Sequence, residues 1–276
     1  MFNLMRGELY KWKKSKAFWG CLIAAVAMMT FTYLMLIFAQ MVQTGQVENG
    51  TMGVTVSGES VSEEDADILE EVGIKGMVQT CTTGGFSVIF TAIFICIWIV
   101  GEYTNGAVKN IVGKGYSRNS IFLARFLSSV VIATVMNLLI FAVTLLLGFA
   151  IMGTEQVNAG FWRDMLSYIG IEVMLSIALS GVIVTICEVT RNMAAGISIS
   201  IALAIFSSVI GNGLDLFFKA IHVDFTASIY WITNAMAECP LEGLDMNFVG
   251  RAIYVAVLWT ALSLFWGMIH FHETDI

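Results

Sequence analysis

The chain contains little charge and a single proline. Asp, Glu, Lys and Arg make up 13% of its 276 residues, whereas 58% are hydrophobic and the mean hydropathy is +0.81. Soluble domains are about one quarter charged, so this composition excludes an ordinary water-soluble fold. It is typical of a polytopic membrane protein.

Sequence signatures of catalysis and cofactor binding are also missing. The three histidines show no H-E-x-x-H or comparable ligand spacing, and the five cysteines form no C-x-x-C pair. Gly113-Lys114 is followed by Gly115, and the nucleotide loop G-x-x-x-x-G-K-S/T occurs nowhere. We therefore expect no enzyme activity, no metal and no cofactor on this chain, so any ATP and Mg²⁺ must be bound by a partner. No basic cluster is interleaved with aromatic residues, which argues against nucleic-acid binding.

Six apolar segments are long enough to cross a bilayer, which takes about 20 residues. They cover residues 17–44, 84–101, 121–152, 165–189, 193–212 and 249–270. The first is too long for the apolar core of a signal peptide and is predicted to be a retained span. We predict an all-α polytopic membrane protein with a single transmembrane domain over residues 1–276.

Basic residues set the orientation of these spans, because Lys and Arg are retained in the cytoplasm. Six spans place both termini on one side of the membrane. If that side is the cytoplasm, the only cations left outside are Lys75, Arg163, Lys219 and Arg251. We therefore predict cytoplasmic N- and C-termini.

Residues 1–16 are predicted to form a helix in the inner membrane interface. The apolar side of its helical wheel carries Phe2, Met5, Leu9 and Trp12. The basic residues lie mostly elsewhere on the wheel, where they can reach anionic headgroups of the membrane lipid. The alternative is a solvated basic flank that only sets orientation.

Two longer segments are expected on the outer side. Residues 45–83 hold most of the acidic excess, and residues 62–73 within them predict a short amphipathic helix. This loop either attracts a cationic substrate or only stays solvated. Residues 213–248 contain apolar pieces too short to cross, which predicts re-entrant or interfacial helices before the last span. Cys81 and Cys239 fall in these outer segments and could form a disulfide.

One ionisable residue, Glu172, lies well inside a predicted span. Tyr168, Ser176 and Ser180 recur around it at four-residue spacing, so the four side chains share one helical face. A carboxylate at this depth costs about 2.5–3.5 kcal/mol on insertion scales, so the face should turn into the bundle or a wet cavity. Glu172 then belongs to a substrate path or subunit interface, or it is a hydrogen-bonded structural residue.

The fifth predicted span is rich in small residues near its start. Gly196 and Ser200 stand four residues apart there. Small residues at this spacing let two helices approach closely, so we predict a tight helix interface at this position.

The segment 102–118 is polar, basic and punctuated by glycines, and it lies between two apolar runs on the predicted cytoplasmic side. Thr104 is predicted to cap a short helix that ends at Gly113. The apolar patch of this helix, beside Lys109, comprises Ala107, Val108, Ile111 and Val112. The patch suits either a groove on a partner protein or the inner leaflet of the membrane.

Several short stretches carry a resemblance to a known family. They are ELYKWKKSK at residues 8–16, GEYTNGAVK at 101–109, GYSR at 115–118, FLAR at 122–125 and FHETDI at 271–276. In their order, the chain resembles the membrane subunits of type-2 ATP-binding-cassette transporters. These are bacterial permeases that include lantibiotic-immunity and peptide-antibiotic exporters.

The resemblance implies a coupling helix after the second span, on which a cytoplasmic ATPase subunit pushes. The implied contact residues are Glu102, Ala107, Val108, Lys109, Ile111, Val112 and Arg118. It also implies a second permease subunit, identical or paralogous, and a place in the bacterial plasma membrane.

The resemblance favours export, or expulsion from the membrane, of an amphipathic peptide or antibiotic. The alternative from another class is an ATP-independent channel or secondary transporter that uses Glu172 as its coupling group. An intramembrane enzyme is disfavoured by the missing catalytic residues.

Overall fold

The computed structural model describes residues 2–43, 74–83, 86–152, 157–223, 225–241 and 243–273, and all regular structure within these ranges is helical. The helices are α1 (Phe2–Lys14), α2 (Lys16–Gln43), α4 (Ile74–Thr83), α5 (Phe86–Thr104), α6 (Ala107–Gly113), α7 (Arg118–Met152), α8 (Ala159–Thr190), α9 (Met193–Ala220), η1 (Ser228–Tyr230), α10 (Ile232–Ala237) and α11 (Met246–Glu273). Five of them, α2, α5, α7, α8 and α11, are long and apolar enough to span a membrane, and the bent α9 makes a sixth if it counts as one span. The predicted all-α, multi-pass class is confirmed.

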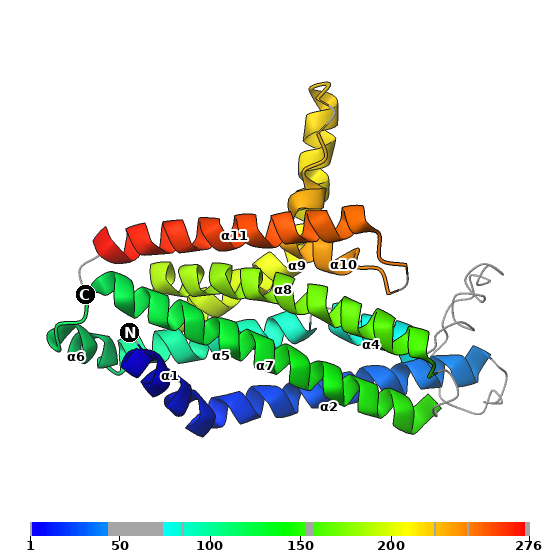
Figure 1. Ribbon diagram of the computed structural model, residues 1–276, viewed down its shortest axis with the longest axis horizontal. Helices are drawn as coiled ribbons and strands as arrows, with labels where there is room; N and C mark the ends of the chain where they lie inside the picture. The colour runs from blue at the N-terminus through cyan, green and yellow to red at the C-terminus, as the bar shows by residue number, and fades with distance from the viewer. Residues whose placement is uncertain are drawn as a thin grey trace, which may run out of the picture.

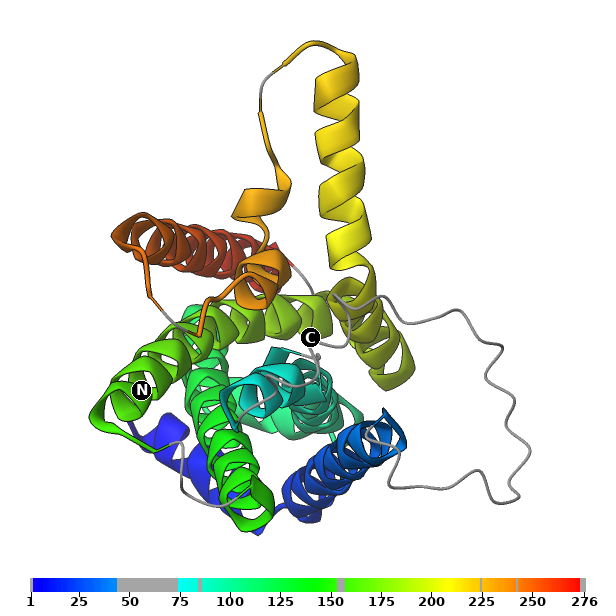
Figure 2. The same ribbon diagram turned by 90° about the vertical axis from the view of Figure 1, so that its right-hand side faces the viewer.

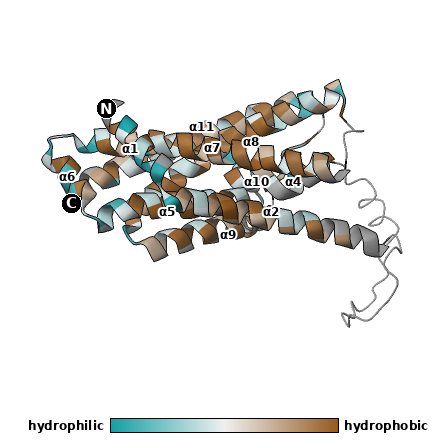
Figure 3. Ribbon diagram, turned by 90° about the horizontal axis from the view of Figure 1, so that it is seen from below, coloured by the Kyte–Doolittle hydropathy of each residue, from teal (hydrophilic) through white to brown (hydrophobic). Residues whose placement is uncertain are grey.

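The long helices run along one axis and form a bundle (Figure 1). Helix α8 is its centre, because it packs against α5, α7, α9 and α11. Gly181 lets α8 approach two neighbours at once: a Cβ there would lie 2.7 Å from the Phe126 ring of α7 and 2.7 Å from the Ser263 hydroxyl of α11. Hydrophobic residues cover most of the length of the bundle (Figure 3), as a bilayer requires.

Both chain termini and α6 lie at the same end of the bundle (Figure 1). The short helix α1 packs across α7 at this end, and its Glu8 side chain is buried. Helix α6 follows α5 after a two-residue turn and packs against it.

The segment before the second predicted span differs from the prediction. Residues 74–83 were expected in the outer loop, but they form α4, which packs against α5 and α7. The reason is an apolar stripe at four-residue spacing, Ile74 and Val78, whose side chains are fully buried. Helix α4 therefore adds a buried helix in front of the predicted second span, which α5 provides with small changes at its ends. The acidic helix predicted at 62–73 lies outside the described residues, as does the rest of 44–73.

The fifth pass also differs. Helix α9 does not end near residue 212 but continues to Ala220, with a bend of 54° between Met193–Phe206 and Val209–Ala220. We call Val209–Ala220 the projecting half of α9, because it stands away from the bundle (Figures 1 and 2). A cluster of Ser and Gly at the bend explains why it forms there. The apolar piece around residues 214–218, expected to be separate, is thus part of α9.

Candidate functional site

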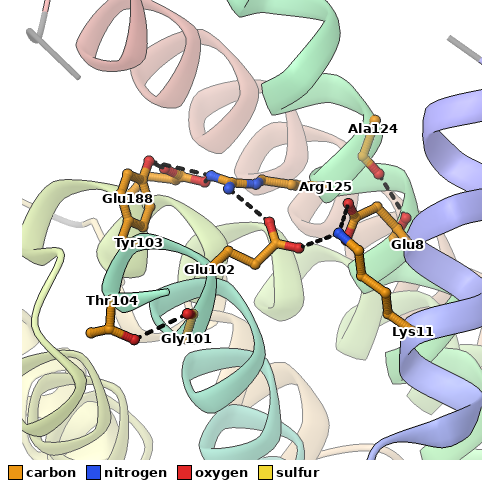
Figure 4. A network of polar contacts seen from close by, with 10 residues as sticks. Glu8, Lys11, Gly101, Glu102, Tyr103, Thr104, Ala124, Arg125 and Glu188 are labelled. Atoms are coloured by element: carbon orange, nitrogen blue, oxygen red, sulfur yellow. Dashed lines mark hydrogen bonds and ion pairs between the residues drawn. The ribbon is translucent and has the colours of Figure 1, made fainter. Parts of the chain in front are cut away.

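Four helices bring charged side chains together at the end of the bundle that carries α6 (Figure 4). We call this group the charge cluster; it comprises Glu8 and Lys11 of α1, Glu102 and Tyr103 of α5, Arg125 of α7 and Glu188 of α8. Its members come from helices that are far apart in the sequence. The cluster therefore ties α1, α5, α7 and α8 to one another.

Arg125 is the centre of the cluster and is 1% exposed. Its Nη2 donates to Glu102 Oε2 over 2.8 Å, and its Nη1 donates to Glu188 Oε1 over 2.7 Å. Nη1 also lies 3.3 Å from the Tyr103 hydroxyl, which in turn donates to Glu188 Oε2. A planar guanidinium can hold two carboxylates in this way, whereas a lysine ammonium offers no such fixed fork.

Lys11 extends the chain of ion pairs to α1. Its Nζ donates to Glu102 Oε1 and to Glu8 Oε1, each over 3.0 Å. Glu102 therefore uses one carboxylate oxygen for Arg125 and the other for Lys11. As a result, two cations, Arg125 on one side and Lys11 on the other, hold the last turn of α5 through Glu102.

The cluster has three carboxylates against two cations, so its charge balance depends on protonation. Burial, followed by the negative charge of Glu102, raises the pKa of Glu8 from 4.5 to about 7. Burial alone would lower the pKa of Lys11, but Glu102 and Glu8 outweigh it and the pKa is raised. A proton on Glu8 removes one of two neighbouring negative charges at the half-exposed Lys11 end of the cluster.

Helix α6 begins one turn beyond the cluster. Its N-cap is Gly106, whose φ of 65° is left-handed and favours glycine. The predicted cap at Thr104 is wrong: the Thr104 hydroxyl donates to the Gly101 carbonyl over 3.0 Å, inside the last turn of α5. The amide of Asn105 donates to the same carbonyl over 3.1 Å. The turn from α5 to α6 is therefore short and hydrogen-bonded.

The predicted contact residues of segment 102–118 have different surroundings. Glu102 is inside the cluster, and Val108 is 1% exposed against the bundle. Ala107, Ile111, Val112 and Arg118 are half-buried. The outward face is formed by Lys109, Asn110, Lys114 and Tyr116. The surface that α6 offers is therefore basic and polar, and its apolar patch mostly faces its own chain.

A cavity of about 380 Å³ lies beside the cluster, between α1, α5 and α6. Lys11, Glu102, Asn105 and Ala107 line it together with Trp98. The charged side chains of Lys11 and Glu102 therefore border open space on this side of the cluster.

The face predicted around Glu172 does turn into the bundle. Tyr168, Glu172, Ser176 and Ser180 are all at least 95% buried. Tyr168 hydrogen-bonds Glu172, and its hydroxyl lies 2.6 Å from Thr82 Oγ1 of α4. Among the described residues, Glu172 Oε1 and Ser176 Oγ have no hydrogen-bond partner. The face therefore holds polar groups in an apolar interior without fully satisfying them.

Gly196 and Ser200 lie where α9 packs against α5 and α8. Ser200 Oγ is 3.7 Å from Cys96 Sγ of α5, and a Cβ on Gly196 would lie 3.6 Å from the same sulfur. Cys187 of α8 completes the contact, with its Sγ 3.0 Å from that of Cys96. The small residues thus stand at a close crossing of three helices.

The disulfide considered between Cys81 and Cys239 is not seen. Cys239 is a free, buried cysteine, and the side chain of Cys81 lies outside the described residues.

Sequence reasoning missed the charge cluster, although a signal was present. Arg125 and Glu188 both fall inside predicted spans, and a charge inside an apolar segment needs a partner. Only Glu172 was singled out on this ground. Glu8 and Lys11 were treated as parts of an interfacial helix, and Glu102 as an exposed contact residue.

These features define a class: a polytopic helical membrane protein whose spans are joined, at the end that carries both termini, by buried ion pairs beneath a short connecting helix. The model of the family described as ABC-2 family transporter protein matches residues 4–207, which is more than half of the chain. The chain belongs to this family of ATP-binding-cassette permeases. A comparison with curated proteins gives no match. The matched residues include the charge cluster and α6 and end at the bend of α9.

Proposed function

We propose that this chain is the permease subunit of an ATP-driven exporter and that a separate cytoplasmic ATP-binding-cassette subunit powers it. Family membership supports the permease role, because permeases of this family work with an ATPase subunit. In this proposal the partner binds ATP and Mg²⁺, and this chain is not itself an enzyme. The N- and C-termini and α6 then face the cytoplasm, which agrees with the bias of Lys and Arg.

The observation that carries this proposal is the position of the charge cluster one turn from α6. A push on α6 reaches the last turn of α5, where Glu102 joins Arg125 and Lys11. Arg125 passes the displacement to α8 through Glu188, and Lys11 passes it to α1. Because buried ion pairs of good geometry resist separation, these helices should move together.

We propose that the ATPase contact is made by the outward face of α6 and the turn after it. Lys109 and Lys114 are exposed there, and Tyr116 is 36% exposed beside them. A basic surface with one aromatic ring suits an acidic groove on the partner. Of the contact residues inferred from the sequence, Glu102 and Val108 are thereby excluded from direct contact with the ATPase, because both are buried inside the protein.

A second permease subunit is proposed as the partner within the membrane. The projecting half of α9 supports this, because Leu216 and Phe217 are 69% and 59% exposed on a helix that leaves its own bundle. The two subunits could be identical or paralogous.

The proposed substrate is an amphipathic peptide or antibiotic taken from the membrane. Its support is the resemblance to peptide-antibiotic exporters in the stretches around α1 and α6. The buried polar face of Glu172 supports a role in the substrate path. The same face supports the second candidate, an ATP-independent channel or secondary transporter with Glu172 as coupling group, because Oε1 lacks a partner among the described residues.

Co-expression of the chain with a candidate ATP-binding-cassette subunit tests the proposal. The two proteins should co-purify, and charge reversal of Lys109 and Lys114 to Glu should abolish this. Reversal of Lys219, an exposed lysine on the projecting half of α9, is the matched control and should leave the complex intact. Intact co-purification of the Lys109→Glu, Lys114→Glu variant would refute the α6 contact, whereas ATP-independent transport by the chain alone would favour the second candidate.

The substrate is tested separately, with a strain that lacks this chain. Increased sensitivity to amphipathic peptide antibiotics, restored by the intact gene, is the expected result. Unchanged sensitivity across such peptides would contradict the substrate class but not the permease role.

A further inference from the structure

A large apolar groove lies outside the part of the chain that the family model matches. It has a volume of about 750 Å³ and lies between the projecting half of α9, η1 and α11. This volume is in the range of about 300–1,000 Å³ found for small-molecule sites. Leu214 comes from α9 and Tyr230 from η1, and α11 forms one wall.

The wall from α11 has the length of one membrane leaflet. Arg251, Tyr254, Leu258 and Leu262 line the groove and follow one another at spacings that place them on one helical face. From Arg251 to Leu262 the helix rises about 16 Å, since each residue adds about 1.5 Å. The hydrocarbon core of a bilayer is about 30 Å thick, so one leaflet is about 15 Å.

The charged end of this wall lies at headgroup depth. Arg251 stands about 8 Å of helix from Met246, the first residue of α11. An arginine so close to a helix end can reach the membrane surface while its stem stays in the apolar region. The groove therefore begins with a cation at the surface and continues with apolar side chains toward the middle of the bilayer.

Trp259, Asp215 and Arg251 around the groove make hydrogen bonds within the protein. Trp259 Nε1 donates to the Tyr230 carbonyl over 2.9 Å, and Asp215 accepts from the amides that begin η1. Arg251 Nη2 donates to Glu238 over 2.9 Å, but Arg251 Nε is buried and has no partner among the described residues. The Arg251 guanidinium lines the groove and uses one nitrogen for Glu238, so its other N–H groups can serve an anionic acceptor such as a phosphate oxygen.

Aromatic rings flank the groove, with Tyr254 about 5 Å and Trp259 about 12 Å of helix from Arg251. Tyr230 stacks on Phe225 with ring centroids 5.7 Å apart and meets Tyr254 at 6.0 Å. Trp231 and Trp259 meet edge to face at 5.3 Å. Tyr254 lies near the level of the lipid headgroups, where membrane proteins place Tyr and Trp.

We propose that this groove is a binding site for one phospholipid. The phosphate binds Arg251, and an acyl chain lies along Tyr254, Leu258 and Leu262. The match of the groove to one leaflet, together with an arginine at its surface end that keeps N–H groups beyond its pair with Glu238, favours a phospholipid over a helix of a second subunit. A helix would bring apolar side chains to the groove but no phosphate for Arg251.

Native mass spectrometry of the full-length chain in mild detergent tests this. The protein is incubated with phosphatidylglycerol, with phosphatidylethanolamine, or with a diacylglycerol that lacks phosphate. One molecule of either phospholipid should be retained per chain, and the diacylglycerol should not. Arg251→Gln should weaken retention about tenfold or more, as expected for the loss of a charge-assisted hydrogen bond. Arg163→Gln, which changes an exposed arginine on α8, should retain phospholipid as the native chain does.

A second variant keeps the test decisive if Arg251→Gln folds poorly. Leu258→Trp narrows the groove without touching the charged end, and it should also lose the phospholipid. Equal retention in the native and Leu258→Trp proteins, or equal retention of diacylglycerol, would overturn the proposal. Either variant could instead convert a dimer to a monomer while phospholipid retention stays unchanged. That result would assign the groove to a second copy of the chain and would also overturn the proposal.

Discussion

Replacing Arg125 tests the charge cluster most severely. Arg125→Met keeps the approximate volume but leaves Glu188 buried without a cation and leaves Glu102 with Lys11 alone. Arg125 donates one charge-assisted hydrogen bond to each carboxylate. Such bonds are worth about 1.5–3 kcal/mol each, and removal of one partner of a buried ion pair costs about 3–5 kcal/mol. We therefore expect the free energy of unfolding to fall by about 3–5 kcal/mol.

A triple variant separates lost charge balance from lost packing. When Arg125→Met is combined with Glu102→Gln and Glu188→Gln, no uncompensated charge remains at the centre of the cluster. Replacing a buried ion pair by neutral groups of similar volume is often close to neutral, so stability should return to within about 1 kcal/mol of the native protein.

The assay is unfolding in mixed detergent micelles, followed by tryptophan fluorescence and checked for reversibility. Arg163→Gln serves as the control, because this exposed side chain should change stability by less than about 0.5 kcal/mol. If Arg125→Met unfolds as the control does, or if the triple variant is less stable than Arg125→Met alone, the reasoning about the cluster is refuted.

Three further predictions concern other positions. The pKa of Glu8 is raised from 4.5 to about 7. The stabilising contribution of Glu8 is therefore fully present below about pH 4.5 and is lost as the pH rises through about 7. Glu8→Gln should remove this part of the pH dependence of the free energy of unfolding. Gly267→Ala should destabilise the protein by about 1–3 kcal/mol in the same assay, because its Cβ would lie 2.3 Å from the buried Phe122 ring, whereas Gly170→Ala, with open space around it, should not. Glu172→Gln should slow export about tenfold, as expected for the loss of one charged hydrogen bond. It should not reduce co-purification of the ATPase. Export at the native rate would remove Glu172 from the mechanism.

Most of the membrane spans could be predicted from the sequence because their apolar length depends only on local composition. Residues 121–152 and 249–270 form α7 and α11 with small changes at their ends. Their apolar length is sufficient for that prediction, whatever they pack against. The inward face of Glu172 was predictable for a similar reason, since one helix period places its four residues together.

The charge cluster could not be assembled from the sequence alone. Its ion pairs join Arg125 to residues 23 and 63 positions away and Lys11 to one 91 positions away. Nothing in a single sequence indicates which of several buried charges meet across four helices. A charge inside an apolar segment shows only that a partner exists.

Tertiary packing also decided the local differences. Helix α4 has a mixed composition that suits a loop. Its apolar stripe stabilises the helix because it is buried against α7. Beyond the bend, α9 passes close to η1, where a Cβ on Gly211 would lie 3.3 Å from the Ser228 Cα, and this contact cannot be read from the sequence. At α6, the N-cap is Gly106 in a left-handed conformation, whereas side-chain preference predicted Thr104 at that position.

The central claim is that an ATPase subunit drives this permease through α6. Site-specific photocrosslinking tests it most directly, with a photoreactive amino acid placed at Lys109 in the chain co-expressed with the ATP-binding-cassette subunit. We predict a covalent adduct between position 109 and the ATPase and none from the same group at Lys219. An adduct from position 219, or none from 109 although the complex is intact, would contradict the account.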